Sequence, residues 1–211
     1  ILLCNERILN YIMKNSFYAI LFRQRYIKRW GLMRNTREET LEEHVAETAI
    51  LAHALASIGN EILNIPANAD RAVTLALFHD AAEVYTGDLP TPVKYYNPEI
   101  SKSYRHIEEE AARRICTTLP GPLRPTYERI MGVGDTQPDE EENHLRRLVK
   151  AAHKLSAYIK CLSEQRSGNK EFDSAALSIR KSIDEYGSPE LDWFMENLLD
   201  AFTVTLDEIG F

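Results

Sequence analysis

Residues 41–56 read LEEHVAETAILAHALA, and this stretch decides the fold class. Its apolar side chains at Leu41, Val45, Ala49, Ala52 and Ala56 recur with the 3.6-residue period of an α-helix. Such a stripe predicts a helix that buries one face in a core. An all-α fold then requires the same period elsewhere in the chain.

Four further segments show that period. Pro120-Gly121-Pro122 cannot continue a helix and closes one of them. Ser188-Pro189-Glu190 predicts a helix start, with a capping hydroxyl before a proline at the first helical position. Because no series of alternating strands is visible, we predict an all-α fold, with room for short 3₁₀ or extended pieces around residues 89–95. The last five residues named below would form the buried side of a last helix, so we expect the chain to end packed and not in a tail. The segments are marked by Ala72, Val73, Ala76 and Leu77; by residues 99–119; by Leu145, Leu148, Ala152, Leu155 and Ile159; and by Leu191, Met195, Leu198, Phe202 and Leu206.

Length and composition predict one cytoplasmic domain. With 211 residues and 44% hydrophobic side chains the chain can bury one sizeable core, and no repeat or linker divides it. The cysteines Cys4, Cys116 and Cys161 are widely spaced, which predicts neither a disulfide framework nor a cysteine-rich zinc site. No apolar run near the start has the length of a membrane span or a signal core.

The charge balance argues against binding of polymeric nucleic acid. There are 32 acidic and 25 basic residues, a net charge of −7, whereas that binding depends on clustered cations. A small phosphate ester needs only a local positive site. Basic residues are dense between Arg23 and Arg37, and this density fits either such a site or a solvated basic face.

The sharpest local feature is the run LFHDAAEV at residues 77–84. On a helix, Glu83 would follow His79 by four residues and Asp80 by three, so all three side chains could project towards one region. An imidazole and a carboxylate together suit a divalent metal ion, and a further carboxylate nearby could act as acid or base. The alternative is a hydrogen-bonded core histidine, the commoner role of a lone histidine at the end of an apolar helix.

A second histidine strengthens the metal hypothesis. His44 lies at the start of the helix predicted from residue 41, beside its apolar stripe, and could meet His79 if the two helices pack antiparallel. The histidines His53, His106 and His144 look like ordinary surface or boundary residues of helices.

In combination these motifs resemble a known family. His44, the doublet His79-Asp80, Glu83 and the run TGDLPTPVKY at residues 86–95 closely resemble the bacterial 5′-deoxynucleotidases of the HD-domain superfamily. The runs RWGLMRN at 29–35 and AYIKCL at 157–162 resemble the same family, so the likeness spans residues 13–209. The resemblance implies a single HD-domain helical bundle over residues 13–211. Residues 1–12 have no counterpart and are interpreted as an N-terminal extension or a remnant of protein expression.

The resemblance also implies an activity and roles for individual residues. The activity is metal-dependent hydrolysis of a deoxyribonucleoside 5′-monophosphate to the deoxynucleoside and phosphate. His44, His79 and Asp80 would be metal ligands, and Glu83 would transfer protons at the attacking water or the leaving oxygen. Arg29 would pair with the phosphate, to which a guanidinium fork is suited.

Two residues would recognise the sugar. The bulk of Trp30 would exclude a 2′-hydroxyl, and Asp88 would accept a hydrogen bond from the 3′-hydroxyl. Each of these roles has a structural alternative. Trp30 could be a core anchor, Arg29 could pair with a nearby glutamate, and Asp88 could stabilise the turn that contains Gly87.

The sequence departs from the family pattern at His153, where the family has a further metal-ligand aspartate. Imidazole is a good ligand for cobalt, nickel, copper or zinc, so a site of three histidines and one aspartate could still bind a metal ion. The other interpretation is a weakened or absent site. We favour a retained divalent ion, which could be cobalt, manganese, copper, nickel or zinc, because the rest of the pattern is intact.

Other functions stay open from the sequence alone. A related HD enzyme could release triphosphate from a deoxynucleoside triphosphate. A nucleotide-binding protein without turnover would explain His153, and a helical partner-binding domain would need none of the motif residues to meet. The family is commonly dimeric, so a homodimer is expected.

Overall fold

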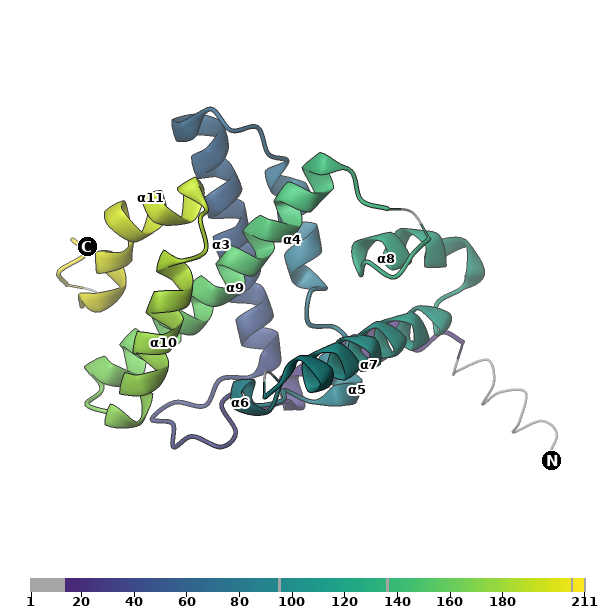
Figure 1. Ribbon diagram of the computed structural model, residues 1–211, viewed down its shortest axis with the longest axis horizontal. Helices are drawn as coiled ribbons and strands as arrows, with labels where there is room; N and C mark the ends of the chain where they lie inside the picture. Colours follow the sequence, from purple (N-terminus) through teal and green to yellow (C-terminus); the bar gives the residue numbers. More distant parts are fainter. Residues whose placement is uncertain (1–13, 95, 136, 206, 211) are drawn as a thin grey trace. The chain divides into compact units, whose positions relative to one another are not determined.

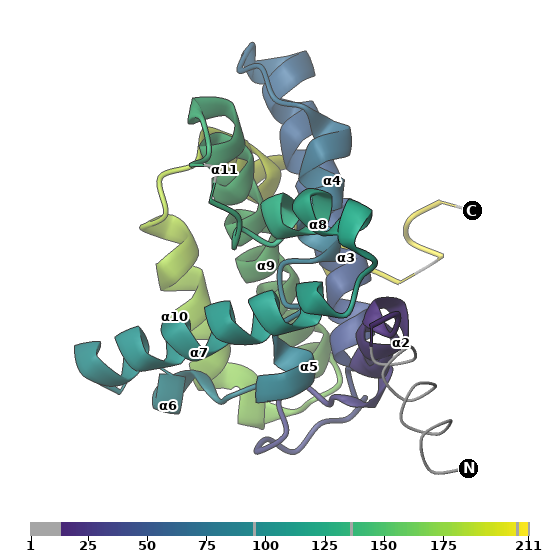
Figure 2. The same ribbon diagram turned by 90° about the vertical axis from the view of Figure 1, so that its right-hand side faces the viewer.

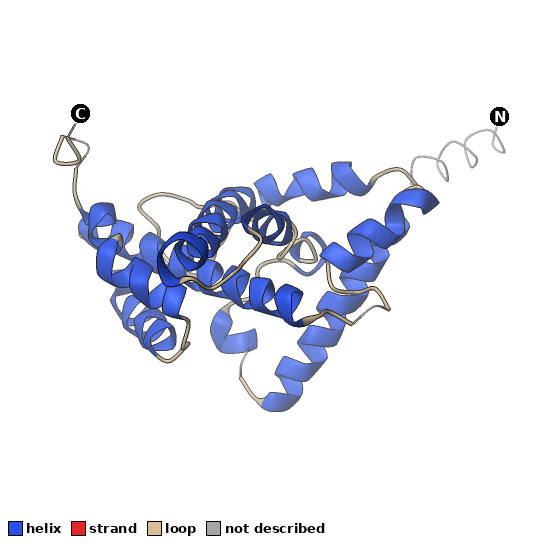
Figure 3. Ribbon diagram, turned by 90° about the horizontal axis from the view of Figure 1, so that it is seen from above, coloured by secondary structure: helices blue, strands red, loops and turns tan. Residues whose placement is uncertain are grey.

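The structure is a computed structural model that describes residues 14–94, 96–135, 137–205 and 207–210. The predicted extension at residues 1–12 lies outside the described residues. Over the described part of the chain every regular element is helical, and the only paired extended segment is an isolated bridge between Lys28 and Thr40 (Figure 3). This confirms the predicted all-α fold class. No helix among the described residues is long and apolar enough to cross a membrane.

The chain divides into two compact units. The first contains the residues up to Arg29, Thr40–Glu42 and Phe78–Gln137, and the second contains Trp30–Glu39, Glu43–Leu77 and the residues from Pro138 onward.

In the first unit a single long helix holds the shorter ones. This helix, α7, contacts α2, α5, α6 and α8, and Figure 2 shows α5 and α8 beside it. Phe17 is completely buried against Ile115 and Leu119 of this part of the chain. The elements are α2 (Phe17–Leu21), η1 (Phe22–Tyr26), α5 (Glu83–Thr86), α6 (Thr91–Lys94), α7 (Pro98–Thr117), η3 (Gly121–Leu123) and α8 (Arg124–Ile130).

In the second unit the longest helix, α9, contacts α4, α10 and α11, and α10 runs beside it (Figure 1). Leu55, Leu148 and Leu155 are almost fully buried in the core of this unit. The elements are α3 (Leu41–Ile58, of which the first two residues belong to the first unit), η2 (Gly59–Leu63), α4 (Ala69–Leu77), α9 (Glu140–Arg166), η4 (Lys170–Phe172), α10 (Asp173–Asp184), α11 (Pro189–Asn197) and η5 (Leu199–Thr203).

The helix boundaries follow the capping chemistry of the sequence. Asn97 and Asp139 begin α7 and α9, where each side chain accepts a hydrogen bond of 2.8 Å from the backbone three residues on. Ser188 caps α11 in the same way, as its Ser-Pro-Glu context predicted. The stripe of α3 is buried at all five predicted positions.

Three details of the helix predictions were wrong. Leu77 is 44% exposed, because α4 buries Ala72, Leu75 and Ala76 and Leu77 lies about 100° round the helix from Ala76. The last helix does not continue to Leu206, which is outside the described residues. It ends at Asn197, a 3₁₀ turn follows, and Phe202 is 42% exposed, so the expected packed end is wrong here too. Residues 91–94 form an α-helical turn, which is neither 3₁₀ nor extended.

A buried carboxylate in α9 anchors the loop between Trp30 and Glu39. Glu164, whose side chain is 1% exposed, accepts hydrogen bonds from Thr36 N (2.9 Å) and Thr36 Oγ1 (2.7 Å). It also accepts from Arg37 N at 3.3 Å, from Asn169 Nδ2 at 2.8 Å and from Lys160 Nζ. Burial by itself would raise the pKa of Glu164, but hydrogen bonds from Lys160, Asn169 and Thr36 hold that pKa well below its usual value.

We predict that Glu164→Gln lowers the free energy of unfolding by about 3–5 kcal/mol, since it leaves Lys160 without its buried partner. The matched control is Glu185→Gln. Glu185 also follows a lysine by four residues, but the Lys181–Glu185 pair is exposed, so its loss should cost less than about 1 kcal/mol. Urea unfolding of both variants at neutral pH measures the difference, and equal losses would contradict the anchoring role.

The same carboxylate predicts a pH dependence. Because the folded pKa of Glu164 is depressed, its contribution is fully present above the unfolded value near 4.5 and is lost as pH falls below it. The stability gap between wild type and Glu164→Gln should therefore narrow between neutral pH and about pH 3. A gap that stays constant over that range would show that the carboxylate charge is not involved.

Candidate active site

The His79-Asp80 doublet lies in a turn between α4 and α5, not on a continuous helix as predicted. Successive turns form here, with Ala81 N donating to Phe78 O at 3.2 Å and Glu83 N to Asp80 O at 3.0 Å. His79 Nε2 lies 3.0 Å from Asp80 Oδ2, and both side chains are largely buried. Glu83 begins the short helix α5, which Gly87 ends with a φ of 72°, a conformation that suits glycine.

Arg29 is a buried guanidinium in the same unit. Its side chain is 8% exposed, and Nη1 lies 4.0 Å from Asp80 Oδ2. The segment before it is fixed by the bridge between Lys28 and Thr40 and by a hydrogen bond of 2.9 Å from Leu41 N to Ile27 O. Asp80 is thus one carboxylate partner of Arg29 within this unit.

Glu83 is a buried acid in a negatively charged setting. The residue is 5% exposed, and burial raises the pKa of its carboxyl to about 9. The carboxylates of Asp80 and Asp88 also contribute to this raised pKa, whereas the charges of Lys94 and Arg29 lower it. In the protein without a metal ion Glu83 therefore holds a proton at neutral pH, and positive charge added at Asp80 would lower its pKa.

Lys94 is a residue of this unit to which the sequence pattern assigned no role. Its Nζ lies 2.7 Å from Glu108 Oε1, and its charge acts on Glu83. The signal was present, because Lys94 belongs to the TGDLPTPVKY run, but a lysine in a loop is ordinarily a solvated surface residue.

In the second unit two imidazoles lie together. His44 is completely buried in α3, and its ring meets the ring of His153 edge to face, with centroids 4.8 Å apart. His44 Nδ1 lies 3.0 Å from Ser156 Oγ and 3.6 Å from Glu39 Oε1. The sequence interpretation missed Glu39 and Ser156, because each lies far from the doublet along the chain and belongs to no motif.

Trp30 is held by its ring and by its indole nitrogen. Nε1 donates a hydrogen bond of 2.7 Å to Glu39 Oε2, and the ring packs against Phe172 with centroids 5.3 Å apart. Its backbone has a φ of 57°, which is uncommon for a residue with a side chain. These contacts agree with the core-anchor role, and the residue as a whole is half-buried. Asp88 is half-buried beside Gly87 in the turn after α5.

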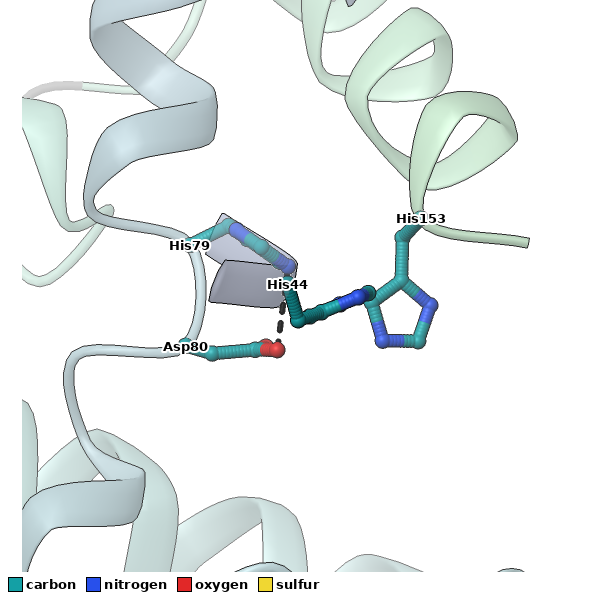
Figure 4. Close-up of side chains that lie close together, drawn as sticks. All are labelled: His44, His79, Asp80 and His153. Atoms are coloured by element: carbon teal, nitrogen blue, oxygen red, sulfur yellow. Dashed lines mark ion pairs between the residues drawn. The ribbon is translucent and has the colours of Figure 1, made fainter. Parts of the chain in front are cut away.

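Four candidate ligands form one group in the described part of the chain. His44, His79, Asp80 and His153 each offer one ligand atom, and these atoms lie within 4.8 Å of one another (Figure 4). Three imidazoles and a carboxylate are a donor set that suits a divalent ion of the cobalt, nickel, copper and zinc group. The other histidines take the ordinary roles expected of them: His53 and His106 are exposed, and His144 pairs with Glu190 at 3.2 Å.

The chain is similar to a family of known proteins over most of its length. Residues 16–202 match the model of the family described as 5′-deoxynucleotidase YfbR-like. The chain is 43% identical to a 5′-deoxynucleotidase of Enterobacter sp. (strain 638), over 93% of this chain and 96% of that protein. It is 44% identical to the 5′-deoxynucleotidase yfbR of Photorhabdus temperata, over 93% of this chain and 97% of that protein.

Solved structures show the same fold at lower identity. An HD-domain phosphohydrolase of Listeria innocua superposes with a TM-score of 0.75 at 20% identity, over 89% of this chain and 88% of that one. The HD phosphohydrolase of cyanophage S-2L, solved with dA and one catalytic zinc ion, has a TM-score of 0.60 at 19% identity, over 87% of this chain and 96% of that one.

Proposed function

The chain belongs to the 5′-deoxynucleotidase YfbR-like family, and from this we propose that it hydrolyses deoxyribonucleoside 5′-monophosphates to the deoxynucleoside and phosphate. It is a phosphoric monoester hydrolase of the HD type. The near-full-length likeness to curated 5′-deoxynucleotidases carries this conclusion. The roles of individual residues are our proposal, supported by their placement within each unit.

A divalent metal ion would be held by His44, His79, Asp80 and His153. The donor set fits such an ion, since each residue offers one ligand atom and three of them are imidazoles. When bound, the ion would supply positive charge to the phosphoryl group and favour ionisation of water. We propose that His153 is a true ligand and that nitrogen-preferring ions, namely cobalt, nickel, copper or zinc, bind more tightly than manganese.

Arg29 and Lys94 give the first unit a preference for an anionic substrate. Both positive charges act on Glu83, which places them in the neighbourhood of the acid. The guanidinium of Arg29 is buried and can present a fork of donors to phosphate oxygens.

Glu83 would move the proton of the reaction. Its carboxyl is buried, so its pKa lies far above that of a solvated glutamate, and it can hold a proton at neutral pH. In that form it can donate to the leaving 5′-oxygen, and as the carboxylate it can accept from the attacking water.

Trp30 and Asp88 would select deoxyribose. The hydrogen bond to Glu39 and the contact with Phe172 fix the indole, and only a rigid wall can reject a substrate by one hydroxyl. The Asp88 carboxylate would accept a hydrogen bond from the 3′-hydroxyl. We also propose that the protein is a homodimer, which the family resemblance supports. A cytoplasmic location is proposed as well, and the free, buried Cys116 and Cys161 support it.

The first prediction from the proposed function concerns the reaction itself. Metal-stripped protein should release inorganic phosphate from deoxyadenosine 5′-monophosphate once cobalt, nickel or manganese is added, and should act much more slowly on adenosine 5′-monophosphate. Phosphate assays on both nucleotides, with deoxyadenosine triphosphate as a third substrate, measure this. Release of triphosphate from the third substrate, or equal rates on both sugars, would contradict the proposal.

The second prediction concerns the acid. Glu83→Gln should lower kcat by about 10²- to 10⁴-fold while metal binding stays intact, because an amide cannot transfer the proton. The matched control is Glu99→Gln, an exposed glutamate in the first turn of α7. Steady-state kinetics with metal content measured on the same samples separates loss of proton transfer from loss of the ion.

The third prediction concerns His153. Calorimetric titration of the metal-stripped protein should show His153→Ala binding cobalt at least about tenfold more weakly than wild type. His153→Asp should shift the preference from nickel and cobalt towards manganese, since a carboxylate replaces a nitrogen donor. The exposed His106→Ala is the control, and unchanged cobalt affinity in His153→Ala would exclude this residue as a ligand.

A further inference from the structure

One face of α7 holds the segment that follows Glu83. Ser101, Tyr104 and Glu108 are spaced by three and four residues, so they lie on the same side of the helix. Each contacts the segment of residues 86–94. No part of the activity proposed above accounts for these contacts.

The contacts converge on Lys94. Ser101 Oγ donates a hydrogen bond of 3.0 Å to Lys94 O, and Glu108 Oε1 lies 2.7 Å from Lys94 Nζ. The ammonium group also sits over the ring of Tyr104, with Nζ 4.8 Å from the centroid, a distance at which a cation is attracted to the ring. The backbone end and the charged end of one lysine are thus both fixed by α7.

The same tyrosine reaches back to the turn that carries Asp88. Tyr104 is 8% exposed, and its hydroxyl donates weakly to Thr86 Oγ1 at 3.4 Å and to Gly87 O at 3.5 Å. Lys94 and Glu108 are each 24% exposed, so the pair is partly withdrawn from water. A lysine loses much rotamer freedom when its ammonium is fixed in one place.

We propose that Glu108 is a positioning residue, which together with the Tyr104 ring fixes the Lys94 ammonium for the anionic group of the substrate. This inference rests on the proposed function and deepens it. Glu108 acts through Lys94 and need not touch the substrate. Without the Glu108 carboxylate the Lys94 side chain would sample many rotamers, and the substrate would have to order it on binding.

The test is Glu108→Gln compared with Glu109→Gln. Glu109 is the next residue of α7 and is exposed, so it matches in chemistry and helix context but not in contact. Glu108→Gln should raise the KM for deoxyadenosine 5′-monophosphate about tenfold and leave kcat within about twofold. A merely structural loss would reduce the folded fraction, and so would lower the apparent kcat at constant KM.

A double-mutant cycle with Lys94→Met tests whether the effect of Glu108 on substrate binding is exerted through Lys94. If Glu108 acts through Lys94, Glu108→Gln should have no further effect on KM in the Lys94→Met background. Additive effects of the two substitutions, or a KM for Glu108→Gln equal to that of Glu109→Gln, would overturn the inference.

Equilibrium binding keeps the inference separate from the activity. Calorimetric titration with deoxyadenosine 5′-monophosphate needs no turnover, and Glu108→Gln should bind about tenfold more weakly than Glu109→Gln. If wild type releases no phosphate, the proposed function fails while this comparison still decides the positioning role. Equal affinities of the two variants would reject the positioning role even for an active enzyme.

Discussion

Burying a charged side chain costs free energy, and each unit contains a buried glutamate for which that cost must be met. Asp80, Glu83 and Asp88 bring three carboxyl groups into one part of the first unit, and the buried Glu83 cannot be ionised cheaply there. Arg29 and Lys94 offset part of that charge. The second unit meets the same constraint at Glu164, which is tolerated because five donors from Thr36, Arg37, Lys160 and Asn169 surround it.

The two buried glutamates differ in the direction in which their pKa is shifted. At Glu164 hydrogen bonds satisfy the carboxylate, its pKa is depressed, and the result is a loop fixed to α9. At Glu83 burial and neighbouring carboxylates dominate, its pKa is raised, and the result is a carboxyl group that holds its proton at neutral pH. The contrast explains why one buried glutamate is interpreted as an anchor and the other as an acid, although both begin as the same residue type in helical surroundings.

The sequence predicts the helices well because their signal is local. The stripe of α3, the cap of α11 and the prolines after α7 all act within one or two helical turns, so a single sequence contains them. The turn at residues 78–82 was not predicted, because an apolar run followed by Ala81 and Ala82 has the composition of a helix. Glu164 was missed for another reason: its partner Thr36 is 128 residues away, and a pair at that separation leaves no periodic pattern.

The same distinction applies to the candidate site. A family pattern points to single residues such as Arg29 and Glu83, but it does not say what holds them. Glu108 and Ser156 are identified only from their contacts in the structure. Glu108 lies beside Lys94, and Ser156 lies beside His44. His153 is the opposite case, since its identity departs from the pattern while its ring lies against that of His44. A set of three neutral imidazoles and one carboxylate carries a single negative charge, so it would neutralise less of a divalent ion than two carboxylates would. The greater net positive charge would then favour an anionic phosphate ester. As a ligand, His153 would therefore alter the choice of metal without removing the reason for the substrate to bind.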